Sequence, residues 1–332
     1  MLKNKSILVT GGTGSFGKEL VRRILKQSPK IKRLVIFSRD ELKQFEMSNE
    51  FNELKYPGIR YFLGDIRDAE RLNTAFRDID IVVHAAALKQ IVAAEYNPFE
   101  FIKTNILGSQ NIVNACLNNN VSNVIALSTD KAVSPANLYG ATKLCADKLF
   151  LSANNIKGNK NIKFSVVRYG NVFGSRGSVV PLFLKQKKEG RFTITDKRMT
   201  RFNMSLSDSV EMVLWSIENN VGSEIFVPKL KSYKITDLAK AIDSKCKIKY
   251  IGINPGEKIH ESLMDINENN YLGDLGKYYA LVDNEKSFKK LKKKHKKIKH
   301  IKNIFEYTSG NNGTFLSASK LKILLSKYIN NN

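Results

Sequence analysis

The sequence has little of what marks secreted, membrane or fibrous proteins. Its three cysteines among 332 residues are odd in number and lack metal-binding spacing, so we expect reduced thiols, as in a cytoplasmic protein. No apolar run approaches the roughly 18 residues that cross a bilayer, and the apolar stretch 7–9 after the basic start is too short for a signal peptide. These absences exclude a disulfide scaffold and predict no integral membrane contact.

Acidic residues are also scarce. There are 31 Asp and Glu against 55 Lys and Arg, a formal net charge of +24, and the segment 286–302 alone holds ten lysines and no acid. Such a surface can attract polyanions, but it is equally the pattern of a solvated lysine-rich face. We favour the solvated face and expect no nucleic-acid partner.

Apolar strands alternate with amphipathic helices through the first half of the chain. Strands are predicted at 6–10, 33–38, 59–63, 81–84, 123–128 and 164–168, and helices at 18–27, 68–76, 99–117 and 141–153. This alternation predicts an α/β fold, a Rossmann-type doubly wound parallel sheet. Later come helices at 206–218 and 235–242, a strand at 224–227 and a helix from 317.

The change in pattern suggests two parts. We expect a dinucleotide-binding domain over 1–175, with 205–227 returning to it. Residues 176–332 are expected to form mainly a smaller C-terminal substrate-binding region that carries the lysine-rich segment and a helical tail.

A glycine-rich segment, 10–17, joins the first strand to the first helix. Gly11 allows a tight turn, Gly14 lets the backbone approach a pyrophosphate, and Gly17 lets the helix pack closely on the strand. The helix N-terminus then offers amides and a favourable dipole to an anion. The loop residues predicted to contact a dinucleotide are Gly11, Thr13, Gly14, Ser15, Phe16 and Gly17.

The end of the second strand bears on which dinucleotide binds. Ser38, Arg39 and Lys43 suit a 2′-phosphate, whereas Asp40 suits the ribose hydroxyls of NAD. NADP is favoured and NAD stays open. Further along the cofactor we expect Asp65, Ile66, Ala85 and Ala86.

Tyr139 and Lys143 lie four residues apart, on one face of a predicted helix. The ammonium would lower the pKa of the phenol. A phenolate can take the proton of an alcohol while hydride leaves for a nicotinamide. Strand five ends shortly before, in Ser128-Thr129-Asp130-Lys131.

Together these motifs resemble the extended short-chain dehydrogenase/reductase superfamily over about 6–227. The strings at 128–131, 138–143, 168–172, 174–181, 199–202 and 255–261 are similar to those of the inverting UDP-N-acetylglucosamine 4,6-dehydratases, which begin pseudaminic acid synthesis. The resemblance implies a UDP-sugar substrate and a homo-oligomer.

The resemblance also implies roles for the catalytic residues. Tyr139 would take the proton of the sugar 4-hydroxyl, with Lys143 lowering its pKa and holding the nicotinamide ribose, and with Thr129 bonded to the 4-oxygen. Lys131, as a neutral amine, would remove the C-5 proton. Asp130, protonated, would give a proton to the departing 6-hydroxyl.

Substrate contacts follow from the same resemblance, and no metal is expected. Asn171, Arg176 and Arg201 would contact the pyrophosphate, Thr195 the uridine and Glu257 its ribose. Lys89 would contact the cofactor or the substrate.

Other functions stay open at this point. A UDP-hexose 4-epimerase or a retaining 4,6-dehydratase would share the fold, but Thr-Asp-Lys at 129–131 argues against both. A non-catalytic dinucleotide-sensing or nucleic-acid-binding protein is the alternative of a different class.

Overall fold

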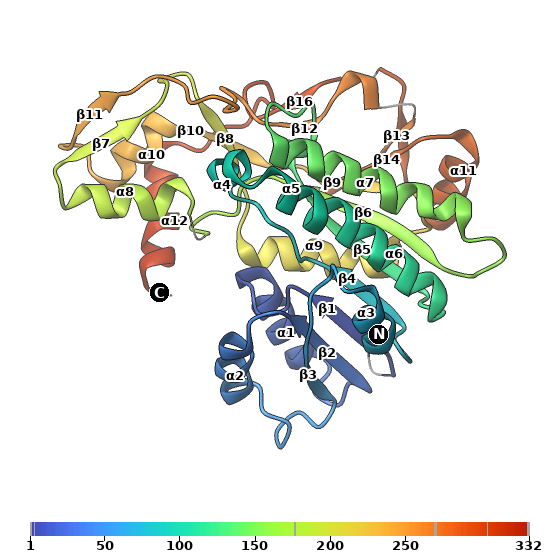
Figure 1. Cartoon of the computed structure of the whole chain (residues 1–332). Coiled ribbons are helices and arrows are strands. Elements are labelled where there is room, and N and C mark those ends of the chain that lie inside the picture. Colours follow the sequence, from blue (N-terminus) through green and yellow to red (C-terminus); the bar gives the residue numbers. More distant parts are fainter. Residues whose placement is uncertain (1, 3, 176, 269–270, 304, 331–332) are drawn as a thin grey trace.

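The fold is built on one large sheet (Figure 1). The computed structural model describes residues 2, 4–175, 177–268, 271–303 and 305–330. Within these ranges a ten-stranded sheet has the order β15-β13-β14-β9-β6-β5-β4-β1-β2-β3. The strands from β3 to β9 are parallel, and β14, β13 and β15 continue the sheet antiparallel. The bounds are β1 Ser6–Thr10, β2 Arg33–Ser38, β3 Ile59–Leu63, β4 Ile81–His84, β5 Asn123–Thr129, β6 Lys163–Tyr169, β9 Ile225–Pro228, β13 Tyr271–Asp274, β14 Tyr278–Val282 and β15 Lys299–Ile301.

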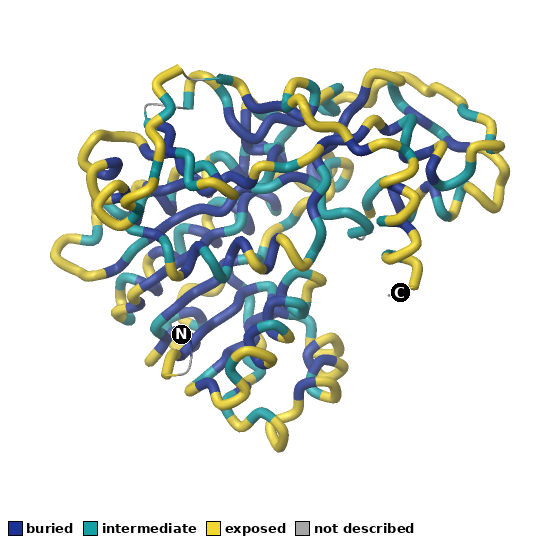
Figure 2. The backbone as a smooth tube through the Cα atoms, turned by 180° about the vertical axis from the view of Figure 1, so that it is seen from behind, coloured by how far each residue is buried: buried dark blue, intermediate teal, exposed yellow. Residues whose placement is uncertain are grey.

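Helices cover both faces of this sheet, because successive strand side chains point to opposite faces and both sets are apolar. One face packs against α3 (Ala69–Ala75), α6 (Gly108–Asn118) and α7 (Leu138–Ile156). The other packs against α1 (Ser15–Gln27), α2 (Glu41–Glu50), α9 (Leu206–Asn219) and α11 (Glu285–Lys294). The buried backbone runs through the middle of the molecule, and exposed residues gather at its edges (Figure 2). The doubly wound α/β prediction is therefore confirmed.

A smaller lobe stands to one side of the sheet (Figure 1). It has a hydrophobic core of its own, which includes Phe183, Phe192, Leu238 and Leu321. The tail helix α12 packs on α10 and buries Leu321 and Leu325 in this core, while its C-terminal end extends out of the lobe (Figure 1). Its elements are α8 Val179–Lys187, β7 Arg191–Ile194, β8 Thr200–Asn203, β10 Lys231–Lys234, α10 Ile235–Ile242, β11 Lys247–Tyr250 and α12 Ala318–Asn330.

Short elements lie between the lobe and the sheet. Strand β12 pairs antiparallel with β16, and a single 3-10 turn, η2, follows β5. The remaining bounds are α4 Ile91–Tyr96, α5 Pro98–Phe101, the π-helix η1 Ile102–Leu107, η2 Asp130–Ala132, β12 Ser262–Met264, η3 Ile266–Glu268 and β16 Tyr307–Thr308.

The lysine-rich segment contributes a helix and a strand to the sheet region, in addition to forming a charged surface. Residues 271–301 lie in the region assigned from sequence to substrate binding. They add the strands β13, β14 and β15 to the central sheet, and helix α11 packs against it. In α11 the side chains of Phe288 and Leu291 are buried against it. The lysines occupy the exposed positions between them. Across the described ranges no helix is both long and apolar enough to span a membrane.

Candidate active site

The glycine loop has the shape that close backbone approach requires. Gly11 has φ 64°, and a Cβ added there would lie 2.9 Å from the Ala86 Cα. A Cβ on Gly17 would lie 2.5 Å from the Gly12 carbonyl oxygen. Helix α1 begins after Gly14 without a side-chain cap and without an acidic residue in its first turn. Its first amides therefore meet no side-chain acceptor, and the loop fits the pyrophosphate of a dinucleotide.

Beside the loop, the cations predicted to hold a 2′-phosphate are paired with acids. Arg39 lies 3.6 Å from the Asp65 carboxylate, and Lys43 forms an ion pair with Asp40. Asp40 also caps α2 by accepting from the Lys43 amide at 3.0 Å. Hydrogen bonds from Lys43 lower the pKa of Asp40. Ser38 is buried and accepts from Gln44 at 3.0 Å.

The other predicted cofactor residues surround the same loop. The Ala85 and Ala86 amides donate to the Thr10 hydroxyl at 3.2 and 3.3 Å. Burial raises the pKa of Asp65, but its hydrogen bonds with Arg67 outweigh burial and the net shift is downward. Ile66 is buried, Thr13 is half-buried, Ser15 is exposed, and the Phe16 ring stacks on Tyr169 with centroids 6.4 Å apart.

Tyr139 lies in the first turn of α7, where the Asn137 side chain caps the helix by accepting from the Gly140 amide at 2.9 Å. Burial raises the pKa of Tyr139 to about 12, and the Lys131 ammonium and the Thr129 hydroxyl oppose that shift. Lys143 is buried one turn further on and donates to the Leu127 carbonyl at 2.8 Å. In the free protein, Lys131 is thus the cation that opposes the rise in the Tyr139 pKa.

Asp130, which is buried, and Lys131, which is half-buried, form an acid–base pair at the end of β5. The Lys131 Nζ lies 3.0 Å from Asp130 Oδ1, which also accepts from the Thr129 hydroxyl at 2.8 Å. Burial raises the pKa of Asp130 more than Lys131 lowers it. Asp130 Oδ2 is buried without a hydrogen-bond partner among the described residues. Such an oxygen has a place for a proton.

Lys131 has to be neutral when it removes the C-5 proton, whereas its surroundings in the free protein favour the ammonium form. Burial lowers the pKa of this lysine, but the carboxylates of Asp130 and Glu261 outweigh burial and the net shift is upward. Glu261 Oε1 lies 3.2 Å from the Lys131 Nζ. The lysine is therefore protonated before substrate arrives.

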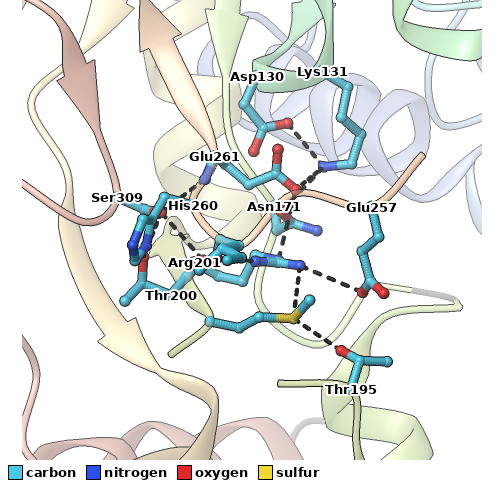
Figure 3. Close-up of polar contacts among 12 residues, drawn as sticks. Asp130, Lys131, Asn171, Thr195, Thr200, Arg201, Glu257, His260, Glu261 and Ser309 are labelled. Atoms are coloured by element: carbon cyan, nitrogen blue, oxygen red, sulfur yellow. Dashed lines mark hydrogen bonds and ion pairs between the residues drawn. The ribbon is translucent and has the colours of Figure 1, made fainter. Parts of the chain in front are cut away.

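The same carboxylate also reaches the cation of the smaller lobe (Figure 3). Arg201 in β8 is buried, with its Nε 3.6 Å from Glu261 Oε1 and its Nη2 3.6 Å from Glu257 Oε1. Its Nη1 donates to the Thr200 and Ile259 carbonyls at 2.8 and 3.1 Å. The guanidinium is held by these bonds at the wall of the site.

Lys131, Arg201, Glu257 and Glu261 line one cavity of about 390 Å³ between the sheet and the smaller lobe, whereas Thr129, Asp130, Tyr139 and Lys143 are not part of its lining. The cavity brings together most of the predicted substrate residues with the predicted base. Asn171 also accepts from the Lys131 Nζ at 3.4 Å. The predicted residues on its wall are Lys131, Asn171, Thr195, Arg201 and Glu257.

One predicted substrate residue that the structure describes, Lys89, is not on that wall. Lys89 follows β4 outside the cavity lining; burial first and the Lys131 charge second lower its pKa. Arg176 lies outside the described residues.

Glu261 is the site residue for which sequence reasoning gave no role. Its string at 255–261 carried a resemblance, but nothing in local spacing connects it to Lys131, far away along the chain. The one sequence feature that could have indicated Glu261 is that it is a second acidic residue in the string 255–261, where only Glu257 was given a role. No cluster of His, Cys, Asp or Glu among the described residues could hold a metal ion.

Fold and site together define a protein of the extended short-chain dehydrogenase/reductase class. Within that class the chain belongs to the family described as polysaccharide biosynthesis protein, which it matches over residues 7–283. It is 51% identical over 329 residues to a UDP-N-acetylglucosamine 4,6-dehydratase (inverting) of Campylobacter jejuni, covering 97% of each chain. It is 45% identical to a UDP-glucose 4-epimerase of Rickettsia bellii, covering 85% of this chain and 84% of that one. It also resembles the X-ray structure of Pen from Bacillus thuringiensis, with a TM-score of 0.89, 36% identity and 98% of each chain covered.

Proposed function

We propose that the protein is a UDP-N-acetylglucosamine 4,6-dehydratase that inverts C-5. The product would be UDP-2-acetamido-2,6-dideoxy-β-L-arabino-hex-4-ulose, the first intermediate of pseudaminic acid or a related surface sugar. The observation that carries this proposal is the ion pair of the buried Asp130 with the half-buried Lys131, beside Tyr139. An epimerase needs no acid or base beyond the tyrosine, whereas loss of water from C-5 and C-6 needs both.

We propose NADP as the cofactor. When bound, its nicotinamide accepts hydride from C-4 of the sugar and returns it at C-6. The residues that would hold the dinucleotide are those of the glycine loop, with Arg39 and Lys43 at the adenosine 2′-phosphate. Support for NADP over NAD comes from Asp40, whose carboxylate already caps α2 and pairs with Lys43.

Exchange of Arg39 for Ala tests this preference. The variant loses a cation from the 2′-phosphate site, so the Kd for NADP is expected to rise about tenfold, a typical loss for one charge-assisted contact. The Kd for NAD should stay within about twofold. Fluorescence titration with both dinucleotides measures it, and equal weakening of the two would contradict the NADP assignment.

The first chemical step belongs to Tyr139 and Thr129. Tyr139 takes the proton of the 4-hydroxyl, and the Thr129 hydroxyl donates to the 4-oxygen as a ketone forms. A Tyr139 phenol with a pKa near 12 is a poor base at neutral pH. The Lys131 ammonium and the Thr129 hydroxyl favour its ionised form, and the remaining cation is Lys143, one turn further along the helix.

The second step uses the proton already held between Asp130 and Lys131. The new ketone acidifies the C-5 proton. Movement of one proton across the 3.0 Å from the Lys131 Nζ to Asp130 Oδ1 yields an amine and a carboxylic acid. The amine takes the C-5 proton, and the acid gives its proton to the departing 6-hydroxyl, which leaves as water. Both groups then carry their original charges again. As hydride returns to C-6, a proton is returned to C-5 on the face opposite to the one that Lys131 deprotonated, so the configuration at C-5 inverts.

Substrate binding is assigned to the cavity wall. Arg201 and Asn171 would meet the pyrophosphate, because charge-assisted bonds to phosphate oxygens are strong and geometrically specific. Thr195 would lie at the uridine and Glu257 at its ribose. Lys89 and Arg176 stay predicted contacts of cofactor, substrate or pyrophosphate.

The deciding experiment is an NMR time course with UDP-N-acetylglucosamine in D₂O, without added reductant. A 6-methyl signal, a 4-keto or hydrated 4-keto carbon, deuterium at C-5 and L-arabino couplings are expected. The same methyl with D-xylo couplings would mean a retaining dehydratase and would overturn the inversion.

A 4-epimerase is the second candidate, favoured by the name of the Rickettsia relative. It predicts UDP-N-acetylgalactosamine in the same tube, without a 6-methyl signal. The Asp130–Lys131 pair is the feature that such a reaction leaves unused.

We also propose that the chain assembles as a homo-oligomer. Support comes from Val92, Tyr96 and Phe99 on α4 and α5, whose large apolar side chains are 73%, 84% and 58% exposed. Sedimentation velocity is expected to show species heavier than the monomer, and a monomer at all protein concentrations would contradict this.

A further inference from the structure

Glu261 is held in place by its backbone. It stands directly before β12, is 4% exposed, and its amide donates to the Ser309 hydroxyl at 2.9 Å. Its carbonyl accepts from the Ser309 amide at 2.8 Å. The backbone of Glu261 is thus tied to the residue that follows β16, and its side chain points toward Lys131 and Arg201 (Figure 3).

One carboxylate oxygen serves two cations. Glu261 Oε1 lies 3.2 Å from the Lys131 Nζ and 3.6 Å from the Arg201 Nε. The other oxygen, Oε2, is buried and has no hydrogen-bond partner among the described residues. Burying a carboxylate costs desolvation free energy, which ion pairs have to offset. For Glu261 the two cations provide this compensation.

We propose that Glu261 is the positioning residue of the C-5 proton transfer. It holds the amine of Lys131 in the cavity and ties it to Arg201, so that the base and the guanidinium of the smaller lobe keep one geometry. The inference deepens the proposed dehydratase and rests on it.

The need for this second anchor follows from the charges in the mechanism. Once Asp130 has taken the proton of Lys131, the ion pair that held the lysine to Asp130 is gone. Lysine has a flexible four-carbon stem, and a neutral amine without a partner would leave its position. The Glu261 carboxylate stays charged and still accepts an N–H of that amine. When the amine takes the C-5 proton, the ammonium forms again beside Glu261.

Glu261→Gln tests the role, because it keeps an acceptor of the same shape and removes the charge. Lys131 removes the C-5 proton only after C-4 has been oxidised, and its ammonium, which favours ionised Tyr139, is still paired with Asp130 in this variant. The holoenzyme variant is therefore expected to form reduced nicotinamide with UDP-N-acetylglucosamine, seen by its absorbance, within a few-fold of the parent rate. Deuterium incorporation at C-5 should fall about 100-fold, as for a reactive group displaced by about 1 Å. Glu261→Asp should recover part of the exchange.

Glu257→Gln is the matched control. Glu257 contacts Arg201 at 3.6 Å but makes no contact with Lys131 among the described residues. Its variant should bind UDP more weakly in calorimetry and keep the parent ratio of C-5 exchange to C-4 oxidation.

The outcomes distinguish a failure of the proposed dehydratase function from a failure of the proposed role of Glu261. If the parent protein forms no 6-methyl sugar, the proposed function fails and the role of Glu261 with it. If the parent dehydrates and Glu261→Gln exchanges C-5 at the parent rate, the role of Glu261 alone is overturned. Loss of oxidation and exchange together, with a lower melting temperature and no recovery by Glu261→Asp, would make Glu261 a structural residue and would also overturn it.

Discussion

At the scale of single residues, Lys131 is where burial and charge pairing compete most directly. Burial alone favours the neutral amine, and two carboxylates at 3.0 and 3.2 Å reverse that preference. The residue type and its place after β5 were predictable from sequence. Its charge was not, because one of the two carboxylates comes from a distant segment.

Replacement of Lys131 by Ala is predicted to abolish C-5 exchange while the fold persists. Without the amine no group of the pair can take the C-5 proton, so we expect a loss of at least about 100-fold, the lower range for one acid–base group. Mass spectrometry of product formed in D₂O measures it. Lys148→Ala, on an exposed position of the same helix as Tyr139, is the control, and exchange at the parent rate in the Lys131 variant would refute the assignment.

His84 gives a prediction about pH and stability. It is buried, its Nδ1 shares a hydrogen bond of 2.8 Å with the Thr10 hydroxyl, and burial, followed by the Lys143 charge, lowers its pKa to about 3. An unfolded chain binds a proton here near pH 6.5. The unfolded state therefore binds more protons between about pH 6.5 and 3, and stability is lost as pH falls through that window, by about 1.4 kcal/mol per unit.

Urea unfolding at pH 6.5 and pH 5 measures this loss. The parent should lose about 2 kcal/mol through His84 over that interval, whereas His84→Gln, which cannot titrate, should not. Because most carboxylates titrate below this window, the difference between the two proteins isolates the histidine. Identical pH dependence in both would show that His84 is not the source.

At the scale of elements, the glycines of the loop allow the start of helix α1 to pack closely against the end of β1. Gly17→Ala would put a methyl group 2.5 Å from the Gly12 carbonyl oxygen, where only backbone could move. We predict a loss of about 1–3 kcal/mol in unfolding free energy, typical of overpacking, together with weaker dinucleotide binding. Denaturant unfolding and dinucleotide titration measure the two effects.

The control for this prediction is Gly158→Ala, where an added Cβ meets nothing within 4 Å and the positive φ of 58° is the remaining strain. That variant should bind the dinucleotide as the parent does. Equal loss of binding in both variants would mean that tight packing at Gly17 is not what shapes the loop.

The bounds of the helices and strands show which elements could be predicted from the sequence. The predicted strands 6–10, 33–38, 59–63 and 81–84 coincide with β1 to β4, because buried parallel strands are short apolar runs with clear ends. The predicted helix 99–117 is instead α5, a π-helix and α6, and an added residue in a helical turn leaves no mark in apolar spacing. Helix α2 was not predicted, since its exposed Leu42 and Phe45 blur the amphipathic pattern.

The smaller lobe was the least predictable part. Its strands β7, β8, β10 and β11 have four residues each and pair across long stretches of chain. Pairs of this kind are set by tertiary contacts and not by local pattern. For the same reason the glycine loop and the Tyr139–Lys143 helix could be predicted from sequence, while the contact of Glu261 with Lys131 could not.

At the scale of the whole molecule, Arg168 joins three parts of the chain. It is fully buried in β6, with Asp147 of α7 at 3.2 Å and Glu268 of η3 at 2.8 Å. Arg168→Met would leave two carboxylates in the interior without their cation, so we predict a loss of about 3–5 kcal/mol. Chemical denaturation measures it.

An exposed ion pair provides the comparison for this prediction. Lys277 and Glu211 lie 2.6 Å apart at the surface, with side chains 58% and 52% exposed. Lys277→Met should cost less than about 1 kcal/mol. If both variants lost the same stability, the Arg168 cluster would not be a joint between the sheet and the segments packed on it.

The distance along the chain between Lys131 and Glu261 has a consequence for synthesis on the ribosome. At about 5–20 residues per second, Glu261 emerges about 6 to 26 s after Lys131. The glycine loop precedes both residues along the chain. A nascent chain thus carries its anion-binding loop before the acid–base pair is made, and the pair gains its second carboxylate only after this further interval of synthesis.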